Sequence, residues 1–131
     1  IASSRSTFRT PFVDLGLLPE AGSSLIAPRL MGHHRAFALL AMGETFSAAD
    51  ALEPAFVNRV VEAEELEEMA VGAARLIAAK PVQAMREARE LVRGDRSDVV
   101  ERMRHEATLW QARLTSQEAR NAFAAFMNRS R

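Results

Sequence analysis

The chain has 131 residues, 48% of them hydrophobic, which suits one modest core and is too little for a second full domain. Seventeen Lys+Arg balance seventeen Asp+Glu, so the net charge of zero gives no electrostatic footprint for nucleic acid. The sequence has no cysteine, which excludes disulfides and thiolate catalysis, and no apolar run approaches membrane-spanning length.

The first third of the chain predicts one extended segment followed by a helix. Residues 6–13 are rich in Thr, Phe and Val and contain Pro11, which is typical of an edge strand or the end of a strand. We expect a helix to start near Pro19, because proline suits the first helical position and small residues follow. Pro28 is expected to limit its length.

The middle of the chain predicts a short helix, a capped helical turn and a second extended segment. Residues 33–42 are amphipathic and are followed by Gly43. Ser47 is a good N-cap for one or two further helical turns. Residues 55–61, "AFVNRVV", predict a second extended segment, and no strand signal follows it.

Four amphipathic helices are predicted after residue 61. Apolar residues recur in steps of three and four over residues 64–79, 81–93, 98–114 and 117–127. Each helix is therefore expected to bury one apolar stripe, and we interpret the Met and Phe residues of these stripes as core residues rather than ligand contacts.

These elements predict a mainly α chain, with two short strands and six to seven helices. Two isolated strands cannot form a stable sheet by themselves, so we expect their partners to lie outside this chain. The chain is then the carboxy-terminal part of a larger α/β protein. A compact all-helical domain with two strand-like connectors is the alternative.

Candidate catalytic residues are few. His33 and His34 are adjacent, so on a helix they point about 100° apart and make poor co-ligands, and no metal site is expected around them or around His105. The sequence has no nucleophile-elbow serine and no glycine-rich phosphate loop. What remains is Glu20, in the segment "TPFVDLGLLPEAGSSL".

Glu20 has two interpretations. Its apolar neighbours, among them Leu17 and Leu18, would desolvate the carboxyl and strengthen it as a base. A helix N-terminus nearby would instead favour the ionised form. From these residues alone, an ordinary acid at the start of a helix fits better than a catalytic carboxylate.

A resemblance favours the catalytic interpretation. The segments "TFRTPF", "LGLLPEAGSS", "PRLMG" and "AADALEPAFVNRVV" resemble the middle and later part of the crotonase superfamily, the enoyl-CoA hydratases and isomerases. The resemblance runs from residue 1 to residue 131 and implies the carboxy-terminal part of the α/β crotonase fold. The family usually has a glycine where Glu53 or Pro54 stands, so the local turn geometry is expected to differ there.

Within this superfamily, the chain is most similar to the peroxisomal-type Δ3,Δ2-enoyl-CoA isomerases. Their catalytic glutamate follows the proline that corresponds to Pro19, which implies that Glu20 shuttles the proton. Hydratases instead carry a glutamate where this chain has Phe12, and a phenylalanine side chain cannot exchange a proton.

The resemblance also implies a substrate and further site residues. The substrate is an acyl-CoA thioester, no separate cofactor or metal is expected, and the oxyanion donors come from segments upstream of this chain. Arg89 and Phe123 are implied as coenzyme A contacts, although an exposed helix residue and a core residue are the simpler interpretations. The substrate-binding residues implied in full are Phe12, Gly16, Leu18, Pro19, Ala21, Arg89 and Phe123.

The same resemblance divides the chain into two regions. Residues 1–61 are expected to form the end of the core with the Glu20 segment, and residues 62–131 a helical region for assembly into homo-trimers or hexamers. We expect no membrane or nucleic-acid partner, and sixteen arginines against one lysine favour a bacterial, cytoplasmic protein. Three hypotheses stay open: an isomerase, a hydratase or other acyl-CoA enzyme, and a non-catalytic assembly protein. Because the implied oxyanion donors come from upstream segments, the 131 residues alone are expected to be nearly inactive.

Overall fold

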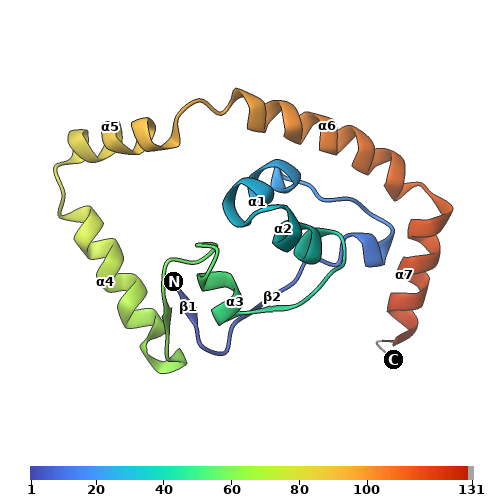
Figure 1. The fold of residues 1–131 in the computed structure, drawn as a ribbon, viewed down its shortest axis with the longest axis horizontal. Coiled ribbons are helices and arrows are strands. Elements are labelled where there is room, and N and C mark those ends of the chain that lie inside the picture. The colour runs from blue at the N-terminus through green and yellow to red at the C-terminus, as the bar shows by residue number, and fades with distance from the viewer. Residues whose placement is uncertain (130–131) are drawn as a thin grey trace.

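The computed structural model describes residues 1–129 and shows a mainly helical chain (Figure 1). The last two residues of the predicted 62–131 region lie outside the described residues. The described helices are α1 (Ser23–Met31), α2 (His33–Leu40), α3 (Ala48–Leu52), α4 (Leu66–Ala78), α5 (Val82–Arg93), α6 (Ser97–Leu114) and α7 (Gln117–Arg129), with short 3-10 helices η1 (Val13–Leu15) and η2 (Ala63–Glu65).

The strands form two minimal sheets. β1 (Ala2–Ser3) pairs in parallel with β4 (Val60–Val61), and β2 (Thr7–Phe8) pairs antiparallel with β3 (Phe46–Ser47). The two predicted extended segments contain β2 and β4, but each has a partner within the chain, which differs from our expectation. Their partners were missed because a two-residue strand is too short to show alternation.

The first helix differs from its prediction at both ends. It begins at Ser23 rather than near Pro19, because Ala21 and Gly22 have φ values of 58° and 80°, which a right-handed helix cannot include. It also continues past Pro28 to Met31, and the N–H of Gly32 donates to the carbonyl of Pro28. The proline removes one hydrogen bond without ending the helix.

Ser47 caps α3 as predicted. Its hydroxyl accepts a hydrogen bond from the N–H of Asp50, and the Asp50 carboxylate accepts from the N–H of Ser47 at 2.8 Å. The Ser47 side chain also donates to that carboxylate, and this bond holds the pKa of Asp50 below its ordinary value. This arrangement is a capping box.

A small hydrophobic core lies between α1 and α2. Phe8, Phe12 and Ala38 pack against its buried residues. Those buried residues are Ala27, Met31, Ala36, Leu39, Leu40 and Phe46. Phe12, in the segment that leads to Glu20, therefore packs against this core.

Helices α4 to α7 form an arc around this core (Figure 1). α6 packs on α1, and α7 packs on η1. On α5, by contrast, Met85 is the one half-buried side chain and the others are exposed, with Val92 at 88%. The predicted buried stripe of α5 is therefore wrong within the described chain, and the prediction also fails for α4, where no residue is buried and Leu76 is 70% exposed.

Candidate functional site

Glu20 lies in the loop that connects η1 to α1. The loop turns through left-handed backbone at Gly16 (φ 68°), Ala21 (φ 58°) and Gly22 (φ 80°). The N–H of Ser23 donates to the carbonyl of Glu20 at 3.0 Å and closes the turn directly before the helix. Left-handed backbone is unfavourable for alanine by about 1–2 kcal/mol, so the surrounding contacts must hold this turn in place.

The side chain of Glu20 is exposed. Within the described part of the chain, its carboxylate makes no hydrogen bond and no ion pair. Leu17 is buried and Leu18 and Pro19 are half-buried, whereas Ala21 is exposed. Leu17, Leu18 and Pro19 thus pack toward the protein and away from solvent. They do not enclose the Glu20 carboxylate in an apolar pocket, as the sequence suggested they would.

One end of the loop is held where α6 meets α7. The guanidinium of Arg113 donates through Nε to the carbonyl of Gly16 at 3.2 Å. A Cβ added to Gly16 would lie 2.8 Å from the backbone nitrogen of Ala119, which is fully buried. Only glycine therefore fits at position 16, because both the positive φ and the close approach of α7 require it.

The other end of the loop is held by a buried acid, Glu106 of α6, whose residue is 4% exposed. Its carboxylate accepts hydrogen bonds from the N–H of Gly22 at 2.6 Å and the N–H of Ser24 at 3.1 Å. It also accepts from the hydroxyl of Ser24 at 2.5 Å, and Arg102 donates to that same hydroxyl. These bonds satisfy free backbone donors at the start of α1.

Sequence reasoning missed Glu106, although a signal was present. Position 106 lies three residues after Met103 and four before Trp110, so Glu106 falls on the same face as the apolar stripe of the predicted helix 98–114. An acid on an apolar helix face is costly to bury unless its carboxylate has hydrogen-bond or ion-pair partners, so its presence there predicts such partners. Its partner segment lies 84 residues away, which no local pattern can reveal.

The other predicted site residues are scattered. Phe12 is half-buried and packs against the core, while its carbonyl accepts from the N–H of Leu17 at 2.8 Å. Arg89 is exposed on α5, and Phe123 is 37% exposed on α7. These two helices lie on opposite sides of the arc (Figure 1), so the described chain does not bring Arg89 and Phe123 together.

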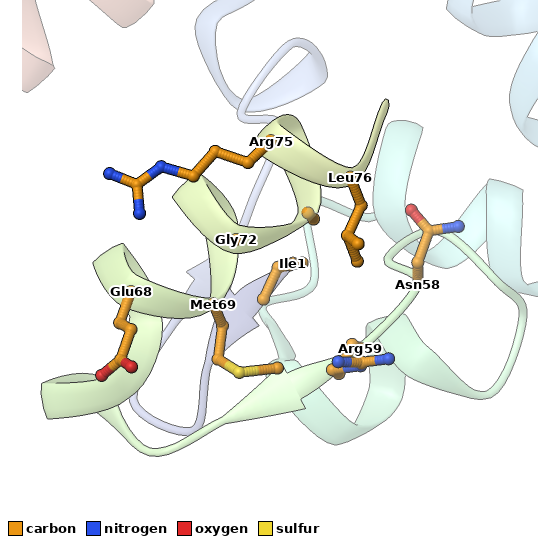
Figure 2. A pocket seen from close by; sticks show the side chains of 9 residues that line it. Ile1, Asn58, Arg59, Glu68, Met69, Gly72, Arg75 and Leu76 are labelled. Atoms are coloured by element: carbon orange, nitrogen blue, oxygen red, sulfur yellow. The ribbon is translucent and has the colours of Figure 1, made fainter. Parts of the chain in front are cut away.

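Two pockets of the described chain bear on the candidate site, and Glu20 lines neither of them. A pocket of about 520 Å³ between η1 and α7 includes Pro11, Asp14 and Leu15, which precede the loop directly. A larger one, of about 800 Å³, lies where α4 faces Ile1 and residues 58–59 (Figure 2), and Glu20 does not line it. Its other lining residues are Glu68, Met69, Gly72, Ala73, Arg75 and Leu76.

Two further properties of residues 1–129 bear on partners. No described helix combines the length and apolar character needed to cross a bilayer. The same residues contain no group of three or more His, Asp or Glu side chains arranged to hold a metal ion. The absence of a metal and of a cofactor stays a prediction.

Two known proteins are similar in sequence to almost the whole of this chain. "Enoyl-CoA delta isomerase 2" of Rattus norvegicus is 33% identical over 129 residues, which cover 98% of this chain and 33% of that protein. "Probable enoyl-CoA hydratase" of Rhizobium meliloti is 34% identical over 128 residues, covering 97% and 50%. The chain thus spans between a third and a half of the length of these relatives.

A solved structure matches the whole arrangement of helices and strands. The crystal structure of an enoyl-CoA hydratase/isomerase from Pseudoalteromonas atlantica T6c aligns with a TM-score of 0.93 and 31% identity, over 97% of this chain and 52% of that one. The profile of one protein family, described as enoyl-CoA hydratase/isomerase, matches residues 1–131. The chain therefore belongs to the enoyl-CoA hydratase/isomerase family.

Proposed function

We propose that this chain is the carboxy-terminal part of an isomerase that converts 3-enoyl-CoA to 2-enoyl-CoA, with Glu20 as the proton shuttle. The observation that carries the proposal is the contrast between positions 12 and 20. Glu20 is a carboxylate on a loop fixed at both ends, whereas Phe12 packs into the core and offers no second acid. The similarity to a rat protein named as an enoyl-CoA delta isomerase supports the same assignment.

The chemistry needs one acid–base group. The Glu20 carboxylate takes the proton from C2 of the substrate, and the electron pair of that C–H bond delocalises through the thioester carbonyl as a dienolate. The carboxylic acid then returns a proton to C4, so the double bond moves from C3 to C2 and no other reactant is consumed. Acid–base catalysis of this kind contributes about 10²–10⁴-fold.

The remaining parts of the site would come from sequence beyond this chain. The dienolate oxygen needs hydrogen-bond donors, and the removal of one such donor typically costs about 10²–10³-fold in rate. We assign these donors, and the walls that would enclose the exposed Glu20, to that additional sequence. The 131 residues alone are then expected to be nearly inactive.

Coenzyme A binding and assembly are part of the proposal. Arg89 is assigned to coenzyme A and Phe123 to its nucleotide portion, as separate contacts because this chain holds the two residues apart (Figure 1). Gly16, Leu18 and Ala21 are assigned to the acyl thioester. The exposed apolar side chains of α4 and α5, among them Ile77 and Val92, support assembly into trimers or hexamers. A cytoplasmic, bacterial location and the absence of a separate cofactor complete the proposal.

Hydration is the second candidate, favoured by the similarity to the Rhizobium protein named as an enoyl-CoA hydratase. In that case an acid outside this chain activates water. An assembly role without turnover is the third, and the exposure of both Glu20 and α5 is the observation that favours it.

The substrate preference of the full-length protein separates these three. We expect turnover of 3-enoyl-CoA to exceed hydration of 2-enoyl-CoA. Faster hydration would favour the second candidate, and no turnover of either thioester would favour the third.

A further inference from the structure

We propose that Glu106 is a positioning residue for Glu20, acting through the backbone at the start of α1. The inference rests on the proposed function, because it gives Glu106 a role in placing the proton shuttle. It is carried by the contacts between α6 and the loop, which do not depend on the reaction assigned.

The bonds of Glu106 replace a missing cap. The N-cap residue of α1 is Gly22, which has no side chain that could accept from the first N–H groups of the helix. One carboxylate from α6 accepts from the N–H groups of Gly22 and Ser24 together. The intervening N–H of Ser23 donates to the carbonyl of Glu20. The donors at the helix start are thus divided between Glu106 and the backbone of Glu20.

The burial of Glu106 indicates that this anchor is specific. An ionised carboxylate is expensive to bury unless its oxygens accept several hydrogen bonds, and here both oxygens accept them. No basic side chain of the described residues forms an ion pair with Glu106, and Arg102 instead donates to the hydroxyl of Ser24. The carboxylate oxygens of Glu106 are therefore bonded to the loop backbone and to Ser24 rather than to a cation.

Packing around Gly22 leaves the loop little freedom. A Cβ at Gly22 would lie 3.1 Å from Cγ1 of Val99 and 3.3 Å from Cγ of Met103, both on α6. The preceding residue, Ala21, is held in left-handed backbone that alanine rarely adopts. Without the Glu106 carboxylate, Ala21 can relax toward a negative φ, and Glu20 moves with it.

Movement of Glu20 would change the rate of the chemical step. A misplacement of about 1 Å in a reacting group can reduce the rate about 10²-fold, whereas substrate binding far from that group is unaffected. A residue that only stabilises the fold would change the melting temperature and leave the rate of the folded enzyme unchanged. The two roles are therefore separable by experiment.

The test uses Glu106→Gln in the full-length protein, with Glu101→Gln as the matched control. Glu101 is exposed on the same helix and loses the same charge. Well below the melting temperature, we expect kcat of Glu106→Gln to fall about 10–100-fold with KM within about twofold. The two N–H groups bond to different carboxylate oxygens, and in the amide one of these positions becomes an NH2 donor. Unchanged kcat in the folded variant would overturn the proposal.

A second variant and a second measurement keep the result decisive. Ser24→Ala removes the hydroxyl contacts with Glu106 and Arg102 and keeps both backbone bonds to the carboxylate. It is expected to lower kcat about 3–10-fold, which covers the case in which Glu106→Gln does not fold. Amide NMR spectra of ¹⁵N-labelled protein should show shifted resonances at Glu20 as well as Gly22 in the Glu106 variant. A resonance of Glu20 that stays in place would contradict the positioning role.

The NMR measurement also separates this inference from the proposed function. If the wild-type protein turns over no 3-enoyl-CoA, the isomerase assignment fails, and the Glu20 resonance still decides whether Glu106 fixes the loop. If turnover depends on Glu20 but is the same in Glu106→Gln, the isomerase assignment stands and the positioning role fails.

Discussion

The carboxylate of Glu106 accepts a 2.6 Å hydrogen bond from the backbone N–H of Gly22, across 84 residues of sequence. Through this contact α6 fixes the turn that carries Glu20. At the other end of the loop, Arg113 and Ala119 hold Gly16. The carboxy-terminal helices α6 and α7 therefore shape the candidate site, although the sequence resemblance implied for their region only assembly and coenzyme A contacts at Arg89 and Phe123.

Removal of the Glu106 side chain should destabilise the fold. Glu106→Ala leaves two N–H groups at the start of α1 without an acceptor in a buried position. We expect the free energy of unfolding to fall by about 2–4 kcal/mol. Urea denaturation measures this, and Glu101→Ala, at an exposed position of α6, should stay within about 0.5 kcal/mol of the parent. Equal effects of the two substitutions would contradict the anchoring contact.

Gly16→Ala should be more harmful than another glycine replacement at a similar φ. At Gly16 the added methyl group would meet the backbone of Ala119, which cannot move without shifting α7. At Gly43 (φ 66°) it would meet the end of the Asp14 side chain, which can rotate away. We expect losses of about 3 kcal/mol and about 1 kcal/mol, respectively, in thermal or urea unfolding. A reversed order would show that α7 does not close on the loop.

Ala21→Gly should stabilise the chain. Alanine at φ 58° carries a steric cost that glycine does not, and the gain is offset in part by the greater freedom of glycine in the unfolded state. The net increase should be about 0.5–1 kcal/mol. The same replacement at Ala107, exposed within α6, should instead cost about 1 kcal/mol. A loss at both positions would contradict the left-handed turn.

The ion pair between Arg29 and Asp98 should make the α1–α6 contact dependent on pH. The side chain of Arg29 donates to Asp98 at 2.6 Å, and this bond holds the pKa of Asp98 below its ordinary value. A lowered pKa in the folded state stabilises the fold above the unfolded-state pKa of about 4, and the stabilisation is lost as the pH falls through the lowered value.

Unfolding of the parent and of Asp98→Asn should accordingly differ at pH 7 and converge near pH 2. Because both side chains are largely exposed, the difference at pH 7 should also shrink in high salt. A difference that is the same at both pH values would show that the ion pair contributes nothing to the stability.

The sequence predicted the elements whose causes are local. The helices after residue 61 were expected at 64–79, 81–93, 98–114 and 117–127, and each observed helix starts and ends within two residues of these bounds. Their periodicity repeats over three or more turns, which is why it could be recognised. The Ser47 cap could also be predicted because its cause is local: its partner Asp50 is three residues away.

What the sequence could not predict depends on distant contacts. The late start of α1 follows from the left-handed turn at Ala21 and Gly22, which contacts with α6 hold. Glu106 was missed because its partners lie in another part of the chain. The apolar residues of α5 recur with the period of a helix. This pattern indicates that one face is apolar, but not that another part of this chain covers that face.

The most direct test of the central claim is the rate of conversion of 3-enoyl-CoA to 2-enoyl-CoA by Glu20→Gln in the full-length protein. Glu44→Gln is the control, because Glu44 is also exposed and also has no side-chain partner within the described residues. The proposal predicts a fall in kcat of about 10²–10⁴-fold for the first variant and none for the second. Full activity of Glu20→Gln would contradict it.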